Sequence, residues 1–395
     1  MPRLVLHIGM SKTGSTSIET TFDASRPILE RHGIDYLDMG QNHSRLMTVV
    51  ATNKVEPLKG DVVRILGIER RDTNYDAATV IGAVRDRLAN PRAPTVVISG
   101  QGLFRYSREK CLALRDFVGP HFDEIRVVAY LRDPTSWASS RAQELMKRGI
   151  TQAQLARELD ERPEDAQLLP HYRASVEAYC EAFGRDHIDL RLFDRKAFVK
   201  GDLLADFCAA IGADPGLAEA LQGSFSNRGA PTEALLLLQA HYDIVEDRLR
   251  AAEGAPPRAA TPSLEALTQA AERYRHPSSS FPIRQAIRNI RGTRWSLPKP
   301  MLDTIWRHSM DDIEWLRRHL GQPELFAAAY PPAEAPAPAW SPETLEDLAR
   351  ALDEALGDVM VPENRRTRLP APLRGAQKYW HRVKRLFRRK GRRQS

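Results

Sequence analysis

The sequence has few cysteines and no long apolar stretch. Its 395 residues include three cysteines, Cys111, Cys180 and Cys208, an odd number whose spacings fit no metal or redox motif. This predicts a reducing, cytoplasmic setting. No run of about 18 apolar residues is present, which argues against a membrane-spanning helix. The opening segment MPRLVLHIG is too short for a signal peptide and is expected to form the first core strand.

Acidic residues are absent from the C-terminal tail. Residues 364–395 hold thirteen of the 58 Lys and Arg but no Asp or Glu, so the chain's net charge of +7 leaves −6 on residues 1–363. An acidic body argues against nucleic-acid binding. Apolar residues of 377–393 fall on one helical face, which predicts a basic amphipathic helix. Such a helix is expected to bind an anionic membrane surface and to attach the protein peripherally to the inner membrane face. Docking of this face on the body, or attraction to an acidic polysaccharide, are the alternatives.

Strands and helices alternate over the first half of the chain. This predicts an α/β fold of three layers, α/β/α, around a central, mostly parallel sheet. Apolar, β-branched runs place the strands at 4–8, 34–37, 94–100, 124–131 and 187–194. Helical patterns cover 15–32, 45–50, 108–118 and 136–149, and then a mostly helical C-terminal region with segments at 231–252, 262–275 and 300–320. The predicted organisation is one domain over 1–330, a Pro/Ala linker at 331–340, a short helix at 341–358 and the basic tail at 364–395.

A loop of small residues follows the first strand. Residues 9–17 read GMSKTGSTS and lead into a helix. Such a loop lets backbone N–H groups turn inward around an anion, and the helix points its positive end at the same place. Lys12 precedes Gly14, so this is not a Walker A loop, in which lysine follows the last glycine. The residues predicted to hold phosphate in this P-loop-like cradle are Ser11, Lys12, Thr13, Gly14, Ser15 and Thr16.

A second anion-binding signal follows the strand at 124–131. The sequence VVAYLRDPTSWASSRAQ (127–143) places Arg132 at the carboxyl end of this strand, where parallel sheets bind ligands. Asp133-Pro134 then starts a helix on which Ser140 lies two turns in. Guanidinium binds phosphate through two parallel hydrogen bonds and serine adds a donor, so Arg132 and Ser140 are candidate phosphate contacts.

Together these two stretches resemble the PAPS-dependent sulfotransferase family, in its bacterial, P-loop-like form. HIGMSKTGSTSIE (7–19) is similar to the family's 5′-phosphosulfate loop, and Arg132 and Ser140 match the arginine and serine that grip the 3′-phosphate. The resemblance extends over roughly residues 1–325 and is sharp only in these stretches. It implies PAPS (3′-phosphoadenosine-5′-phosphosulfate) as co-substrate, adenosine 3′,5′-bisphosphate as product and no metal.

The activity implied is sulfuryl transfer to a hydroxyl or amine of a glycan, lipid or small-molecule acceptor. Lys12 would stabilise charge on the leaving phosphate. In this family the base comes from the loop after the second strand or from the end of the central strand. Gln101 stands at the latter place and cannot accept a proton, which leaves His43 as the favoured base and Glu19 as a further option. A solvent-facing or helix-capping role for His43 is the alternative.

Three points stay open in the sequence. SFSNRGAP (224–231) resembles a late loop that closes over the nucleotide with Arg228 supplying charge, but a surface loop that opens a helix fits equally well. The chain could instead be a nucleotide-binding, P-loop kinase-like protein, against which stands the order of Lys12 and Gly14. It could also be a non-catalytic member of the sulfotransferase fold, which Gln101 favours.

Overall fold

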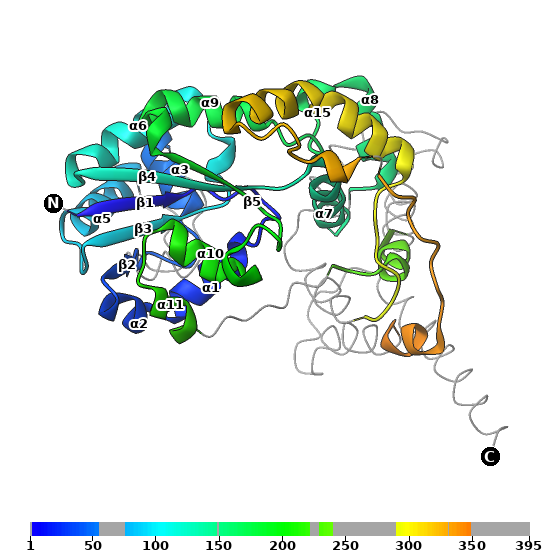
Figure 1. Ribbon diagram of the computed structural model, residues 1–395, viewed down its shortest axis with the longest axis horizontal. Helices are drawn as coiled ribbons and strands as arrows, with labels where there is room; N and C mark the ends of the chain where they lie inside the picture. Colours follow the sequence, from blue (N-terminus) through cyan, green and yellow to red (C-terminus); the bar gives the residue numbers. More distant parts are fainter. Residues whose placement is uncertain are drawn as a thin grey trace, which may run out of the picture. The chain divides into compact units, whose positions relative to one another are not determined.

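The computed structural model describes residues 2–54, 76–147, 150–221, 229–239, 290–330 and 332–348. Its centre is a five-stranded, all-parallel sheet of order β2-β3-β1-β4-β5 (Figure 1). The strands are β1 (Arg3–His7), β2 (Ile34–Tyr36), β3 (Thr95–Ser99), β4 (Glu124–Leu131) and β5 (Ile188–Leu192). The predicted α/β class with a central parallel sheet is confirmed.

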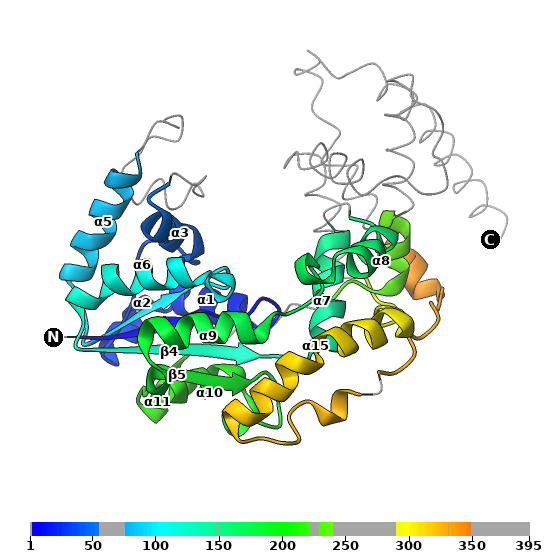
Figure 2. The same cartoon turned by 90° about the horizontal axis from the view of Figure 1, so that it is seen from above.

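Helices cover both faces of the sheet, as buried parallel strands require. On one face Phe22, Phe207 and Leu217 pack on the strand residues Val5 and Val128. The helices of this face are α1 (Ser15–Ala24), α2 (Arg26–Arg31), α10 (Leu203–Ala210) and α11 (Pro215–Ala220). Figures 1 and 2 show the opposite face covered by α3 (Ser44–Thr52), α6 (Arg108–Val118) and α9 (Tyr172–Phe183), with α5 (Ala77–Ala89) packed beside α3.

The first predicted helix is two helices. The sequence pattern predicted one helix over 15–32, whereas α1 ends at Ala24 and α2 begins at Arg26. Pro27 occupies the first turn of α2. Proline is tolerated there, but inside a continuous helix it would remove a hydrogen bond and clash with the preceding turn. The break at Ser25 is therefore the consequence of Pro27.

Further helices lie beyond the carboxyl ends of the strands. α7 (Pro134–Met146) starts directly after β4, and Asp133 caps it by accepting from the Ser136 backbone N–H at 2.9 Å. α8 (Gln152–Glu161) and the long α15 (Lys299–Leu320) pack against α7, whereas η1, a 3₁₀ turn at Leu103–Arg105 that follows β3, packs against α3. The predicted helix at 300–320 is confirmed as α15.

The chain divides into two compact units, Met1–His276 with Gly292–Trp340, and Pro277–Arg291 with Ser341–Ser395. In the second unit residues 342–348 are helical, and the Asp347 carboxylate accepts from the Arg291 guanidinium at 2.8 and 3.1 Å. The rest of the helix predicted at 341–358, and the tail at 364–395, lie outside the described residues. The domain boundaries given above stay predictions.

Candidate functional site

The loop between β1 and α1 is tightly folded around two glycines. A Cβ on Gly9 would lie 2.3 Å from Ser15 Oγ and 2.9 Å from His7 Nε2, so no other residue fits there. Gly14, the N-cap of α1, has φ 76° and would meet Leu203 Cδ2 at 2.3 Å. Lys12 also has a positive φ, 67°, which an L-residue adopts at a cost of about 1 kcal/mol or more. The positive φ angles of Lys12 and Gly14 are therefore maintained by the side chains packed around the loop.

The N-terminus of α1 opens onto this loop. Among the described residues no side chain caps it, and its first turn holds no acidic residue. Thr13 is buried and its hydroxyl donates to the Met10 carbonyl at 2.6 Å, so it shapes the loop. Ser15 is buried as well, whereas Thr16 is exposed. A helix N-terminus without an acidic cap, next to the Lys12 ammonium, suits an anion.

Arg132 reaches from the end of β4 to the same loop. Its Nη1 donates to the Lys12 carbonyl oxygen at 3.0 Å and its Nε donates to Ser136 Oγ at 2.9 Å. The guanidinium also lies over the Phe193 ring, 5.6 Å from its centroid. Burial, and secondarily the nearby Arg294, lowers the pKa of Arg132, which remains a cation because an arginine titrates far above neutral pH. The two predicted anion-binding motifs therefore meet, although they are 120 residues apart.

Helix α7 braces the loop at two more points. The buried Trp137 donates from Nε1 to the Ser11 carbonyl at 2.8 Å, and Glu144 Oε2 lies 3.1 Å from Lys12 Nζ. Ser140 is half-buried and lies one turn from both Ser136 and Glu144. Residues four apart share a helix face, so Ser140 is on the side of α7 that contacts the loop. Neither Glu144 nor the bracing contact of Trp137 was predicted from the sequence.

A network of buried polar groups lies beneath the loop. His7 Nδ1 and Ser99 Oγ are 2.8 Å apart, and Ser99 Oγ donates to Glu19 Oε1 at 3.4 Å. Glu19 is only 2% exposed and also accepts from Asn42 Nδ2 at 2.7 Å. Burial lowers the pKa of His7 to about 3, and its Nε2 has no hydrogen-bond partner in the described part of the chain. These groups hold the ends of β1 and β3 together with α1.

The geometry does not support His43 as a general base. His43 is fully buried, its Nδ1 accepts from the Ser99 backbone N–H at 3.0 Å, and its Nε2 lies 2.8 Å from the Leu37 carbonyl oxygen. Burial lowers the pKa of His43 to about 4. Both ring nitrogens are thus engaged within the protein. The alternative of a structural histidine fits better: its backbone N–H and ring fix the loop after β2 to β3. Gln101 is exposed at the end of β3.

A late segment of the chain also packs on α7. Ser139 Oγ lies 3.2 Å from Ser296 Oγ and accepts from the Leu297 backbone N–H at 3.3 Å. This segment carries Arg294, the neighbour that lowers the pKa of Arg132. Arg228 lies outside the described residues, and its role stays a prediction. Arg294 was not predicted from the sequence, because only the fold brings it near Arg132.

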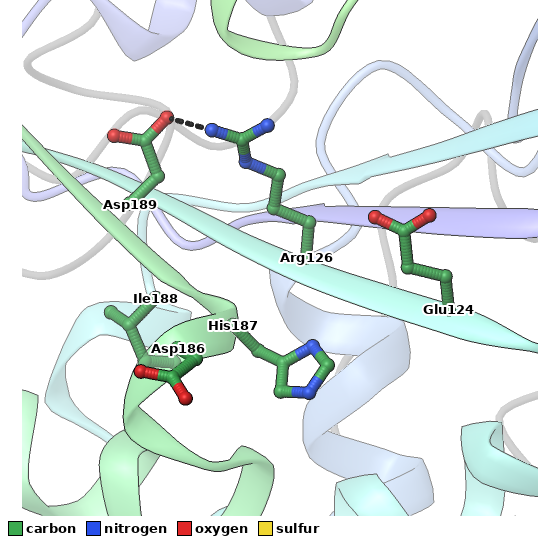
Figure 3. A pocket seen from close by; sticks show the side chains of 6 residues that line it. All are labelled: Glu124, Arg126, Asp186, His187, Ile188 and Asp189. Atoms are coloured by element: carbon green, nitrogen blue, oxygen red, sulfur yellow. Dashed lines mark hydrogen bonds and ion pairs between the residues drawn. The ribbon is translucent and has the colours of Figure 1, made fainter.

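A hollow of about 330 Å³ lies at the opposite edge of the sheet (Figure 3). Glu124 and Ile188, which line it, begin β4 and β5, and Arg126 there pairs with Asp189 at 2.8 Å. Ligands of parallel sheets bind at the carboxyl ends of strands, so we place the candidate site at the loop of residues 9–14 and not here. Among the described residues no group of three or more His, Cys, Asp or Glu could hold a metal ion, and no helix is long and apolar enough to cross a membrane.

Comparison with known proteins finds a weak likeness to a solved structure. The sequence matches no protein-family model and no curated protein. A solved structure, a sulfotransferase from Alicyclobacillus acidocaldarius, aligns with a TM-score of 0.35 and 18% identity, over 65% of this chain and 97% of that chain. Similarity of this size establishes no function.

Proposed function

We propose that the protein is a PAPS-dependent sulfotransferase that acts on a hydroxyl or amine acceptor. The observation that supports this best is the meeting of two anion-binding elements at one sheet edge: Arg132 Nη1 contacts the carbonyl of Lys12 at 3.0 Å. PAPS carries a 5′-phosphosulfate and a separate 3′-phosphate, so it needs two such elements. The loop at 9–14 with Lys12 would take the first group, and Arg132 with Ser140 the second.

The roles of these residues follow from the charges that change during transfer. As the sulfuryl group leaves, negative charge develops on the 5′-phosphate oxygen, and a preorganised cation there stabilises the transition state. Lys12, two residues before the N-cap of α1, would take this role, and the helix dipole would add to its effect. No metal is needed for this charge stabilisation. The acceptor would be a glycan, a lipid or a small molecule that reaches the same edge of the sheet.

Two other functions predict different ligands. A kinase-like protein would prefer ATP, but Lys12 precedes Gly14 and has a left-handed backbone, which is not the Walker A arrangement. A non-catalytic member of the fold would bind the nucleotide without turnover. The exposed Gln101 is compatible with the non-catalytic alternative, because glutamine cannot take a proton.

The test is a turnover assay with PAPS and a defined acceptor panel of a neutral glycan, an amino-sugar glycan, a glycolipid and a phenol. Formation of adenosine 3′,5′-bisphosphate is measured. We expect Lys12→Ala to lower turnover by roughly 10²–10³, as the loss of a transition-state donor does. Lys196→Ala, at an exposed position, is the control and should match the wild type. Equal turnover by Lys12→Ala and the wild type would contradict the assignment.

A further inference from the structure

The side chain of Lys12 is paired with an acid on α7. Glu144 Oε2 lies 3.1 Å from Lys12 Nζ and 3.3 Å from Arg141 Nη1. The side chains of Lys12 and Glu144 are 32% and 24% exposed, so both reach the surface of the site. The Glu144 carboxylate thus lies against the cationic side chains of Lys12 and Arg141. The Glu144 carboxylate is therefore ion-paired with Lys12, the residue proposed to stabilise the leaving group.

The other candidate bases at this sheet edge are less suited to take a proton from an acceptor. Both ring nitrogens of His43 are engaged and the ring is fully buried. Glu19 is 2% exposed and accepts from Asn42 and Ser99. Asp133 is the N-cap of α7 and accepts from the Ser136 and Thr135 side chains as well. Glu144 combines a negative charge, partial exposure and contact with Lys12.

We propose that Glu144 is the general base of the reaction, an assignment that rests on the proposed sulfuryl transfer. The acceptor oxygen forms a bond to sulfur, and the bond from sulfur to the 5′-phosphate oxygen breaks with its electron pair on that oxygen. The acceptor proton passes to the Glu144 carboxylate and from there to water. Adenosine 3′,5′-bisphosphate and the sulfated acceptor leave, and the charges balance.

The ion pair also explains how the base becomes accessible. The anionic donor competes with Glu144 for the Lys12 ammonium, because both are anions near one cation. When Lys12 turns to the phosphosulfate, the carboxylate keeps the guanidinium of Arg141, its neighbour on the same helix, and is held beside the acceptor. Glu144 thus pairs with Lys12 before the donor binds and takes the proton afterwards.

The proposal predicts opposite effects on binding and on turnover. Glu144→Gln removes a negative charge beside the anion site, so affinity for adenosine 3′,5′-bisphosphate should rise by about twofold to fivefold, in line with the value of a partly exposed ion pair. Turnover should fall by about 10²–10⁴, the usual contribution of a general base. Calorimetric titration measures the first and bisphosphate formation from PAPS the second. Glu124→Gln, at the opposite edge of the sheet, is the matched control and should change neither.

Chemical rescue separates a base from a structural ion pair. Formate should raise the turnover of Glu144→Ala at least tenfold, because it can take the proton in the space that the side chain leaves. It should not raise the turnover of Lys12→Ala. Turnover of Glu144→Gln within threefold of wild type, or weakened binding together with no rescue, would overturn the assignment while leaving the proposed function intact. If the wild type neither binds the bisphosphate nor turns over PAPS, the proposed function fails and the assignment of Glu144 with it.

Discussion

At the scale of single residues, the site depends on groups whose burial decides their chemistry. His7 and His43 both carry imidazoles, yet both are fully buried and neutral beneath the sheet edge. Glu144 and Lys12 are partly exposed charges above it. A histidine at the expected place in the sequence is therefore not the proton acceptor that its ordinary pKa would suggest. The residues that remain available for chemistry are the charged ones on the loop and on α7.

The buried histidines predict a loss of stability in acid. Burial lowers the pKa of His7 to about 3 and of His43 to about 4, against about 6.5 in the unfolded chain. Their contribution is present in full above about pH 6.5 and is lost as the pH falls toward the folded values, because the unfolded chain takes up protons first. We expect the free energy of unfolding to fall by about 1.4 kcal/mol per pH unit for each histidine between about pH 6 and pH 4.

Urea denaturation at pH 7 and pH 5 measures this slope. His43→Gln should be less stable than the wild type at pH 7, since it breaks buried hydrogen bonds, but should lose less on acidification. His308→Gln, on the exposed side of α15, should keep the wild-type slope. An unchanged slope in His43→Gln would show that His43 is protonated in the folded state or accessible to water.

At the scale of elements, α7 supports the loop between β1 and α1. Arg132 just before it, Trp137 in its second turn and Glu144 near its end all contact Ser11 or Lys12. The start of α9 adds a further anchor, since the Tyr172 hydroxyl donates to the Arg132 carbonyl. Because the loop backbone is held at positive φ, such contacts from outside the loop are what maintains its shape.

Trp137→Phe tests this bracing. The change removes the Nε1 donor to the Ser11 carbonyl while keeping an aromatic ring, and one lost hydrogen bond costs about 1 kcal/mol. We expect affinity for adenosine 3′,5′-bisphosphate, measured by calorimetry, to fall about threefold to tenfold. Trp315→Phe on α15 is the control and should leave affinity unchanged. Wild-type affinity in Trp137→Phe would mean that the loop keeps its shape without α7.

The elements with a strong local signal were predicted well. The expected strands lie close to β1–β5, because short β-branched runs between loops are local features of the sequence. The helices α5, α8, α9, α10 and α11 were not predicted. α8 buries only two apolar residues, Leu155 and Leu159, so few positions show its helical period. Lys12 and Arg132 were predicted from their motifs, and the structure brings the two into contact. The contacts of Glu144 and Trp137 with the loop were not predicted, since they join residues more than 120 apart and depend on how α7 packs.

At the scale of the whole molecule, charge is divided between an acidic body and a basic tail. The thirteen Lys and Arg of residues 364–395 contrast with the net charge of −6 on residues 1–363. Each such cation near an anionic membrane contributes about 1 kcal/mol, so a few suffice for weak attachment. The proposed peripheral contact with the inner membrane face concerns the location of the protein, and the candidate site does not depend on it.

Vesicle sedimentation tests the role of the tail. The full chain should sediment with phosphatidylserine vesicles at low salt and be released as salt screens the attraction. A chain truncated after residue 363 should stay in the supernatant with both anionic and neutral vesicles. Equal sedimentation of the two chains would exclude the tail as a membrane-binding segment.

One site should bind a nucleotide that carries both a 5′- and a 3′-phosphate, and a thermal-shift titration measures this binding. Adenosine 3′,5′-bisphosphate, ATP and 5′-AMP are titrated into the wild type and Arg132→Ala. At 100 times Kd the bisphosphate should add about 2.7 kcal/mol of stability, which is a shift of several degrees at roughly 2–4 °C per kcal/mol. We predict a shift that is specific to the bisphosphate and lost in Arg132→Ala. No shift, or a larger shift with ATP, would contradict the account.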